Sequence, residues 1–253
     1  MINSEKSDYK IVDYASITTN DPNPFKRKLQ NIRLHHSITK IIQNEKSAFN
    51  GNLLDFGSGN GELSKRLSQL YQEMKIYCYE PAKGYREQAE RNLAGIKNVR
   101  IIPDLEQMGS ISFDYIVCLE VFEHLPENKI KETLNIFFNI LDDDGIIIIG
   151  VPVEIYLPAL VKGFFRMIRR YGDVDALPIN IIRAAVGKPS RTRPVKEIDT
   201  GLPYIFRHIG FDYRRLEKLL KIQFNIVKRY GSPFTGLPVA LNFESYYVCK
   251  RQK

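Results

Sequence analysis

Three glycines at alternate positions, Gly57, Gly59 and Gly61, constrain the fold of this chain more than any other feature. They follow a short apolar run that ends in Asp55, and leucines recur at helical spacing over residues 63–70. This order predicts a buried parallel strand, a tight turn and the start of a helix. Glycine suits the turn, because the backbone must bend sharply and a Cβ would keep a ligand away from it. The first turn of the helix would then offer free N–H groups to that ligand.

The spacing of the glycines indicates which ligand to expect. A dinucleotide fingerprint, G-x-G-x-x-G, would place its third glycine at position 62, where this chain has Glu62. The observed pattern is G-x-G-x-G, preceded by Asp55, and it resembles motif I of the class I S-adenosylmethionine (SAM)-dependent methyltransferases. In that family the loop holds the amino acid end of SAM. The alternative is a glycine-rich turn that binds no ligand. The segments that follow in the sequence distinguish between these two interpretations.

Two further strand-like segments end in acids. Residues 76–81 are β-prone and end in Glu80, followed by Pro81. In a doubly wound sheet, an acid at this point is placed to accept hydrogen bonds from ribose hydroxyls, and Glu80 resembles the family residue that does so. Residues 99–104 read as a third strand ending in Asp104. The resemblance implies a contact between Asp104 and the adenine amino group.

Two later segments strengthen the resemblance. Residues 113–126 are apolar through Leu119, as expected for a strand buried on both faces. They resemble the family segment F-D-x-x-x-x-x-E-V-x-E-H, which closes over SAM. Residues 141–152 resemble the L-x-x-G-G segment and a fifth strand, although Asp144 replaces the first glycine.

These matches, which occur in the order found in the family, imply its fold and its cofactor. We expect an α/β, Rossmann-like, seven-stranded and mostly parallel sheet, with an antiparallel terminal hairpin and a helical insertion after the fifth strand. The cofactor would be S-adenosyl-L-methionine. The residues expected to bind it are Asp55, Gly57, Ser58, Gly59, Gly61, Glu80, Pro81, Asp104, Leu105, Leu119 and Glu120.

The chain divides into four expected parts. Residues 1–46 form a polar segment and a helix over about 25–43, and residues 47–152 form the SAM-binding core. Residues 153–205 form a basic helical insertion, and residues 206–253 complete the core with a helix and a strand pair.

The insertion contains a segment of amphipathic pattern, residues 158–171. Its apolar positions share one helical face, and the other face carries Lys162, Arg166, Arg169 and Arg170. We expect a lid whose apolar face covers the acceptor pocket. The alternative is peripheral contact with an anionic membrane surface through residues 158–171.

Composition limits the class of protein. The three cysteines share no metal or disulfide spacing, so we predict neither a disulfide nor a metal site. No apolar run is long enough to span a membrane, and the first residues lack the apolar core of a signal peptide. We therefore expect a cytoplasmic protein, or one at the inner membrane surface. The net charge of +8 favours an acceptor that carries anionic groups.

Methyl transfer from SAM requires alignment of the acceptor and, for an oxygen of high pKa, removal of its proton. His124 and His208 are the candidate catalytic residues, because both are expected beside the acceptor and imidazole titrates near neutral pH. The alternative for each is a structural histidine. No N-P-P-[YF] segment is present, which argues against adenine and glutamine amino-methyltransferases.

The predicted function is therefore methyl transfer, with an oxygen of a small molecule, lipid or cell-surface glycan precursor as first choice. An RNA methyltransferase is the alternative that the charge suggests, but no RNA-binding module is evident and nucleic acid is disfavoured. A catalytically silent SAM-binding subunit is a further alternative.

Overall fold

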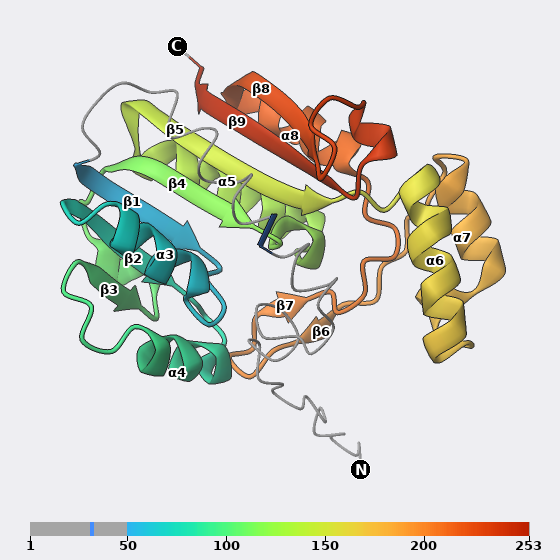
Figure 1. The fold of residues 1–253 in the computed structure, drawn as a ribbon, viewed down its shortest axis with the longest axis horizontal. Coiled ribbons are helices and arrows are strands. Elements are labelled where there is room, and N and C mark those ends of the chain that lie inside the picture. The colour runs from blue at the N-terminus through green and yellow to red at the C-terminus, as the bar shows by residue number, and fades with distance from the viewer. Residues whose placement is uncertain (1–30, 33–49, 253) are drawn as a thin grey trace.

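The computed structural model describes residues 31–32 and 50–252 of the chain. Residues 31–32 are helical, but the rest of the helix predicted over 25–43 and the boundary at residue 46 lie outside the described residues. The described part consists of one large sheet with helices on both of its faces, and a helical segment beyond one end of the sheet (Figure 1).

The sheet has seven strands. In chain order they are β1 (Gly51–Phe56), β2 (Met74–Tyr79), β3 (Val99–Ile102), β4 (Phe113–Leu119), β5 (Leu141–Pro152), β8 (Phe224–Ser232) and β9 (Glu244–Arg251). Their order in space is β3-β2-β1-β4-β5-β9-β8. The first five strands pair in parallel, whereas β9 is antiparallel to both β5 and β8. The predicted seven-stranded, mostly parallel sheet with an antiparallel terminal pair is confirmed.

α-Helices connect most of the parallel strands, and a short 3-10 helix lies between β3 and β4. The α-helices are α3 (Glu62–Leu70), α4 (Lys83–Asn92), α5 (Glu127–Ile140), α6 (Leu157–Arg170), α7 (Pro178–Ala185) and α8 (Tyr213–Gln223). Short 3-10 helices are η1 (Leu105–Met108), η2 (Phe122–His124), η3 (Val174–Ala176) and η4 (Val239–Leu241).

The core lies on both faces of the sheet, because successive strand residues point to opposite sides. Leu53 packs with α3, whereas its neighbour Leu54 packs on the opposite side with α5 and α8. Both leucines are fully buried. The continuous apolar runs of β1, β4 and β5 are explained by this burial on two faces.

The insertion after β5 has two parts with different positions. Helices α6 and α7 pack on each other beyond the end of β5, and a two-stranded ladder follows, β6 (Lys196–Glu197) with β7 (Pro203–Tyr204) (Figure 1). The ladder lies near the carboxyl ends of the central strands. The insertion was expected to be helical, and the structure adds this short strand pair to its helices.

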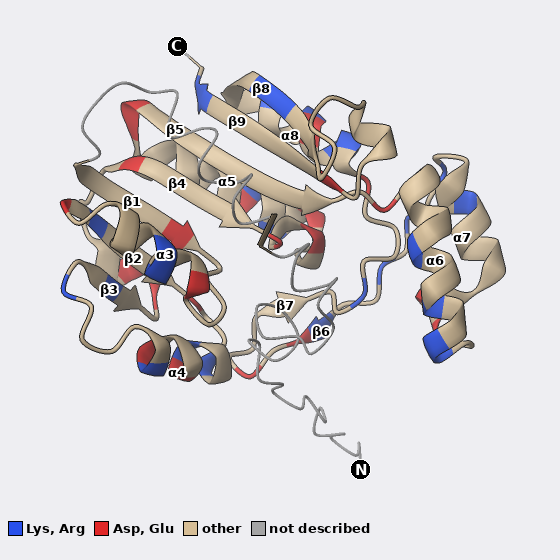
Figure 2. Cartoon of the chain, viewed as in Figure 1, with Lys and Arg blue, Asp and Glu red and all other residues tan. Residues whose placement is uncertain are grey.

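The orientation of α6 also differs from the expectation. Its basic side chains Lys162 and Arg166 turn inward and bind the buried carboxylate of Glu154, at 3.0 and 2.8 Å. The apolar face of α6 consequently points outward. Figure 2 shows the basic residues along this helix.

Candidate active site

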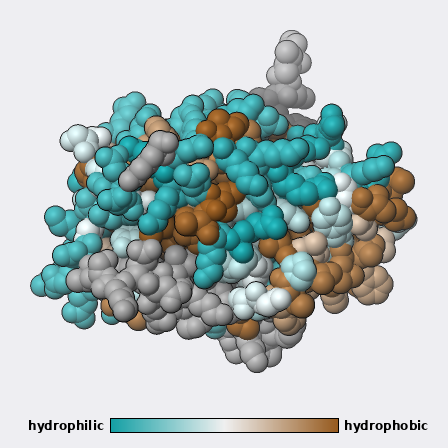
Figure 3. All heavy atoms as spheres, turned by 90° about the horizontal axis from the view of Figure 1, so that it is seen from above, coloured by the Kyte–Doolittle hydropathy of each residue, from teal (hydrophilic) through white to brown (hydrophobic). Residues whose placement is uncertain are grey.

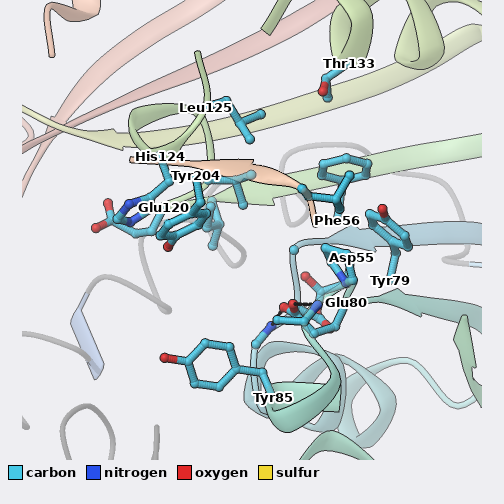
Figure 4. Close-up of a pocket in the computed structure, with 18 of the residues that line it drawn as sticks. Asp55, Phe56, Tyr79, Glu80, Tyr85, Glu120, His124, Leu125, Thr133 and Tyr204 are labelled. Carbon is cyan, nitrogen blue, oxygen red and sulfur yellow. Dashed lines mark hydrogen bonds between the residues drawn. The ribbon is translucent and has the colours of Figure 1, made fainter. Parts of the chain in front are cut away.

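A pocket of about 500 Å³ opens at the carboxyl ends of β1, β2 and β4. Ligands of open parallel sheets bind at this edge, and the volume is within the range of small-molecule sites. Figure 4 shows two groups of side chains in it. Asp55, Glu80 and Tyr85 lie at one end, and Glu120, His124 and Tyr204 lie at the other.

The glycine loop after β1 forms one wall of the pocket. Gly57, Gly59 and Gly61 all have positive φ angles, of 75°, 57° and 76°, which side chains with a Cβ rarely adopt. A Cβ on Gly57 would also lie 2.4 Å from a methyl group of Val121. The loop is tied to β2, since the N–H groups of Gly57 and Ser58 both donate to the carbonyl of Tyr79, at 2.9 and 3.0 Å. Only glycine at position 57 fits both the conformation and the close approach to Val121.

Glu80 links the end of β2 to this loop. One oxygen of its carboxylate accepts a hydrogen bond from the N–H of Gly59 at 2.8 Å, and the other accepts from the N–H of Ala82 at 2.9 Å. Burial raises the pKa of Glu80 to about 7, against the lowering effect of these two hydrogen bonds. The carboxylate lines the pocket, in the position expected for a group that binds ribose hydroxyls.

Asp55 has a partner within the fold. Its carboxylate accepts a hydrogen bond from the hydroxyl of Ser64 at 2.7 Å, which ties the end of β1 to α3. Burial raises the pKa of Asp55 to about 6. Asp55 therefore lines the pocket and also fixes the position of the helix that follows the glycine loop.

Two residues of the expected cofactor set do not line the pocket, Gly61 and Asp104. Gly61 precedes the first residue of α3, and a Cβ there would lie 2.6 Å from the side chain of Leu93. Asp104 accepts a hydrogen bond from the N–H of Glu106 and caps η1. In this structure both have packing or capping roles instead. The other members of the set do line it: Asp55, Gly57, Ser58, Gly59, Glu80, Pro81, Leu105, Leu119 and Glu120.

The two candidate catalytic histidines meet on the far wall. The ring centroids of His124 and His208 lie 4.9 Å apart, and His124 stacks on Tyr204 at 4.6 Å with nearly parallel planes. Nδ1 of His124 lies 2.8 Å from the carbonyl oxygen of Ile205. Burial lowers the pKa of His124 to about 4, with a further contribution from His208, so its imidazole is neutral at physiological pH.

The sequence did not point to the aromatic and hairpin residues of the pocket. The β6–β7 ladder and its loop contribute Ile198, Leu202, Pro203 and Tyr204, whereas no residue of α6 or α7 lines the pocket. The expected cover over the site therefore comes from this hairpin and not from the helices. Tyr79 and Tyr85 also line the pocket, at the end that contains Asp55 and Glu80. The position of Tyr79 directly before Glu80 is the one local signal in the sequence that indicates Tyr79.

This sheet order, the glycine loop after β1 and the acid after β2 define a class I methyltransferase fold. The comparison with known families agrees. Residues 54–147 match the model of a family described as a methyltransferase domain. Residues 54–147 are therefore similar to methyltransferase domains, and the sheet around them has the fold of the class I SAM-dependent methyltransferases.

One curated protein and two solved structures illustrate what the chain is similar to. An uncharacterised methyltransferase of Oceanobacillus iheyensis is 26% identical over 115 residues, which cover 45% of this chain and 50% of that protein. The chain thus spans about half the length of the curated relative that it matches. Among solved structures, the PH0226 protein of Pyrococcus horikoshii has a TM-score of 0.58 at 13% identity, covering 95% of this chain and 97% of that one. A SAM-dependent methyltransferase of Leishmania major has a TM-score of 0.53 at 18% identity, covering 88% and 74%. At these identities the structures show a shared fold.

Proposed function

We propose that this protein transfers the methyl group of SAM to an oxygen of a small molecule, a lipid or a cell-surface glycan precursor. The observation that carries the proposal is a single pocket with the glycine loop and Glu80 at one end and the histidine pair at the other. A methyl donor and an acceptor must meet in one such space, because the transfer is an in-line displacement that depends on alignment.

The cofactor end suits SAM in charge and shape. The amino acid end of SAM would lie against residues 57–59, where the absence of Cβ atoms at Gly57 and Gly59 permits close approach. The ribose hydroxyls would donate to Glu80, replacing the N–H of Gly59 as a partner of that carboxylate. Leu105 and Tyr79 would contact the adenine. The sulfonium methyl would then point along Leu119 and Glu120 towards the histidines.

The acceptor end favours an oxygen nucleophile. A hydroxyl of high pKa needs a group beside it that helps to remove its proton, and His124 and His208 are the residues that we place there. Apolar side chains of the hairpin, Ile198 and Leu202, would exclude water from the sulfonium.

The experiment that tests this function is transfer of a labelled methyl group from SAM into fractionated extracts. We expect label in a small-molecule or lipid fraction with the parent chain, and little with Glu80→Ala, which should bind SAM weakly. Label in the RNA fraction alone would favour an RNA acceptor. Absence of label in every fraction, from a chain that binds SAM, would favour the silent subunit.

We also propose that the outer face of α6 and α7 contacts a membrane surface. Large apolar side chains are exposed there, including Phe164, Phe165 and Ile168, which are 56, 58 and 66% exposed. Figure 3 shows a hydrophobic cluster at the end of the molecule where these helices lie. Exposed apolar patches of this kind mark interaction sites, and the exposed Arg169 and Arg183 beside this one favour anionic lipid. No helix among residues 31–32 and 50–252 is long and apolar enough to cross a bilayer.

Vesicle flotation tests the membrane contact. The parent chain should float with anionic vesicles and stay bound in high salt, because insertion of apolar side chains is not screened. A triple variant with serine at positions 164, 165 and 168 should remain in the pellet. Ile222→Ser is the matched control, since Ile222 is 67% exposed on α8. Equal flotation of both variants would contradict the membrane contact. So would a dimer that sedimentation detects in the parent chain and not in the triple variant.

A further inference from the structure

Three potential metal ligands converge at the acceptor end of the pocket. Glu123, His124 and His208 each offer a ligand atom, and these atoms lie within 4.8 Å of one another. We propose that they bind a divalent first-row transition metal ion, which holds and activates the oxygen of the acceptor. This inference rests on the proposed function for its chemical role, but not for the binding of the ion.

The outer contacts of both histidines direct the remaining ring nitrogen towards the cluster. Nδ1 of His124 faces the carbonyl oxygen of Ile205 at 2.8 Å, and Nδ1 of His208 faces a carboxylate oxygen of Glu154 at 3.4 Å. An acceptor at Nδ1 favours the tautomer with the proton on Nδ1 and leaves Nε2 with its lone pair. Metal-binding histidines are commonly oriented in this way by a carbonyl or a carboxylate.

Glu123 supplies the anionic ligand. Its side chain is fully buried, and one carboxylate oxygen lies 3.8 Å from Nε2 of His124. That distance is too long for a hydrogen bond. Two ligands of one tetrahedral ion are about 3.4 Å apart when each bond is about 2.1 Å. Small side-chain adjustments would therefore bring the three atoms to the spacing of a metal site.

Glu120 lies beside the three-residue cluster and would be a fourth ligand if its carboxylate moved towards it. It lines the pocket, and its charge acts on the imidazole of His124 (Figure 4). Its φ angle is 56°, a left-handed conformation that is uncommon for a residue other than glycine. Backbone strain of this kind is concentrated at functional sites.

The surrounding charges are compatible with a cation. Arg193 lies beside the cluster, where its guanidinium donates to the main-chain carbonyl of Glu123. The two carboxylates of Glu120 and Glu123 outnumber this one guanidinium. Bound divalent charge would be balanced further by an acceptor oxygen that has lost its proton.

The donor set indicates the class of ion. Two imidazole nitrogens with one or two carboxylates suit zinc, manganese, iron or cobalt, whereas magnesium and calcium prefer oxygen ligands alone. Three or four protein ligands leave a coordination position for the substrate. The open position would face the pocket and hence the methyl group of SAM.

The ion would act as a Lewis acid on the acceptor. With their Nε2 lone pairs on the ion, the two histidines would act through it and not as bases: the hydroxyl oxygen of the acceptor would bind the ion, its pKa would fall, and its proton would leave to water. A lone pair of that oxygen then forms the bond to the methyl carbon. The bond between the methyl carbon and sulfur breaks, and its electron pair neutralises the sulfonium to give S-adenosylhomocysteine. The products are the methyl ether or ester, S-adenosylhomocysteine and one proton.

Direct measurement of metal binding tests the inference. The full chain is stripped with a chelator and titrated with Mn²⁺, Zn²⁺ or Co²⁺, with binding followed by the loss of the free Mn²⁺ resonance signal or by calorimetry. We expect one ion per chain. Glu123→Gln and His208→Ala should each weaken binding at least tenfold, because each removes a ligand. Glu132→Gln is the matched control; it lines the same pocket outside the cluster and should bind like the parent.

A parallel titration with S-adenosylhomocysteine separates this inference from the proposed function. The two ligand variants should bind it like the parent. If the parent binds it but none of the three ions, the metal site is wrong and the methyltransferase proposal stands. If ions bind and S-adenosylhomocysteine does not, the metal site stands without the proposed function. Equal metal affinity in parent and variants would also overturn the inference. Should Glu123→Gln fail to fold, His208→Ala carries the test, because its side chain is partly exposed.

Discussion

The ionisation of Glu80 gives a quantitative prediction for cofactor binding. Burial raises the pKa of this carboxyl to about 7. In the proposed complex the ribose hydroxyls would donate hydrogen bonds to its ionised form. The charged form is lost as pH falls through 7, so affinity for S-adenosylhomocysteine should fall from pH 8 to pH 6. With a pKa of about 7, the ionised fraction drops from about 0.9 to about 0.1. The expected loss is about tenfold, or about 1.4 kcal/mol.

Calorimetry on the parent and on Glu80→Gln measures this effect. The glutamine is nearly isosteric and cannot ionise, so it should bind more weakly at pH 8, by roughly ten- to a hundredfold for a lost charged hydrogen bond. Titration of the ligand and of other groups, Asp55 included, affects the parent and the variant equally. The ratio of their two affinities at each pH therefore reports the ionisation of Glu80 alone. That ratio should shrink about tenfold between pH 8 and pH 6. A ratio that does not change with pH would refute the role of an ionised Glu80.

Three further predictions concern the loop, the hairpin and the insertion. Gly57→Ala should weaken binding of S-adenosylhomocysteine more than tenfold in calorimetry, because of its φ of 75° and a Cβ 2.4 Å from Val121; unchanged affinity would contradict the loop assignment. Tyr204→Ala removes the ring stacked on His124 and should raise KM for the acceptor in steady-state assays, while SAM affinity stays constant; a matching loss of SAM affinity would place the hairpin at the cofactor end. Glu154→Ala removes the carboxylate that binds Lys162 and Arg166 of α6, so the free energy of unfolding should fall by about 3–5 kcal/mol in urea. A fall of less than about 1 kcal/mol would contradict its structural role.

The sequence predicts the structural features that depend on residues close together in the chain. The strands and the glycine loop could be predicted from the residues, because a run buried on two faces and a turn with positive φ angles each demand particular residues. The seven-stranded sheet was implied by the resemblance to the family. The position of Glu80 at the wall of the pocket could be predicted for the same reason, since the end of a strand fixes the position of the next side chain.

The insertion was harder to predict. The helical period of residues 158–171 showed two faces but did not show which one packs inward. That choice depends on Glu154, a carboxylate buried by tertiary contacts, which draws Lys162 and Arg166 towards the core. The apolar face is thereby left outside, and the cover over the pocket comes from the short β6–β7 hairpin.

The metal-ligand cluster could not be predicted from spacing. His208 lies 84 positions after His124, and only the path of the insertion brings their rings to 4.9 Å. The adjacent Glu123 and His124 were visible in the sequence, but two neighbouring residues have no diagnostic spacing for a metal. The prediction of no metal site depends on the spacing of the cysteines alone.

The central claim is that the pocket between the glycine loop and the histidines holds SAM. Calorimetric titration of the purified parent chain with SAM tests it most directly, with NAD as the competing ligand. We expect one site per chain with a Kd in the micromolar range or tighter, no heat from NAD, and a loss of roughly ten- to a hundredfold for Glu80→Ala. Binding of NAD in place of SAM, or SAM binding that Glu80→Ala leaves unchanged, would contradict the account.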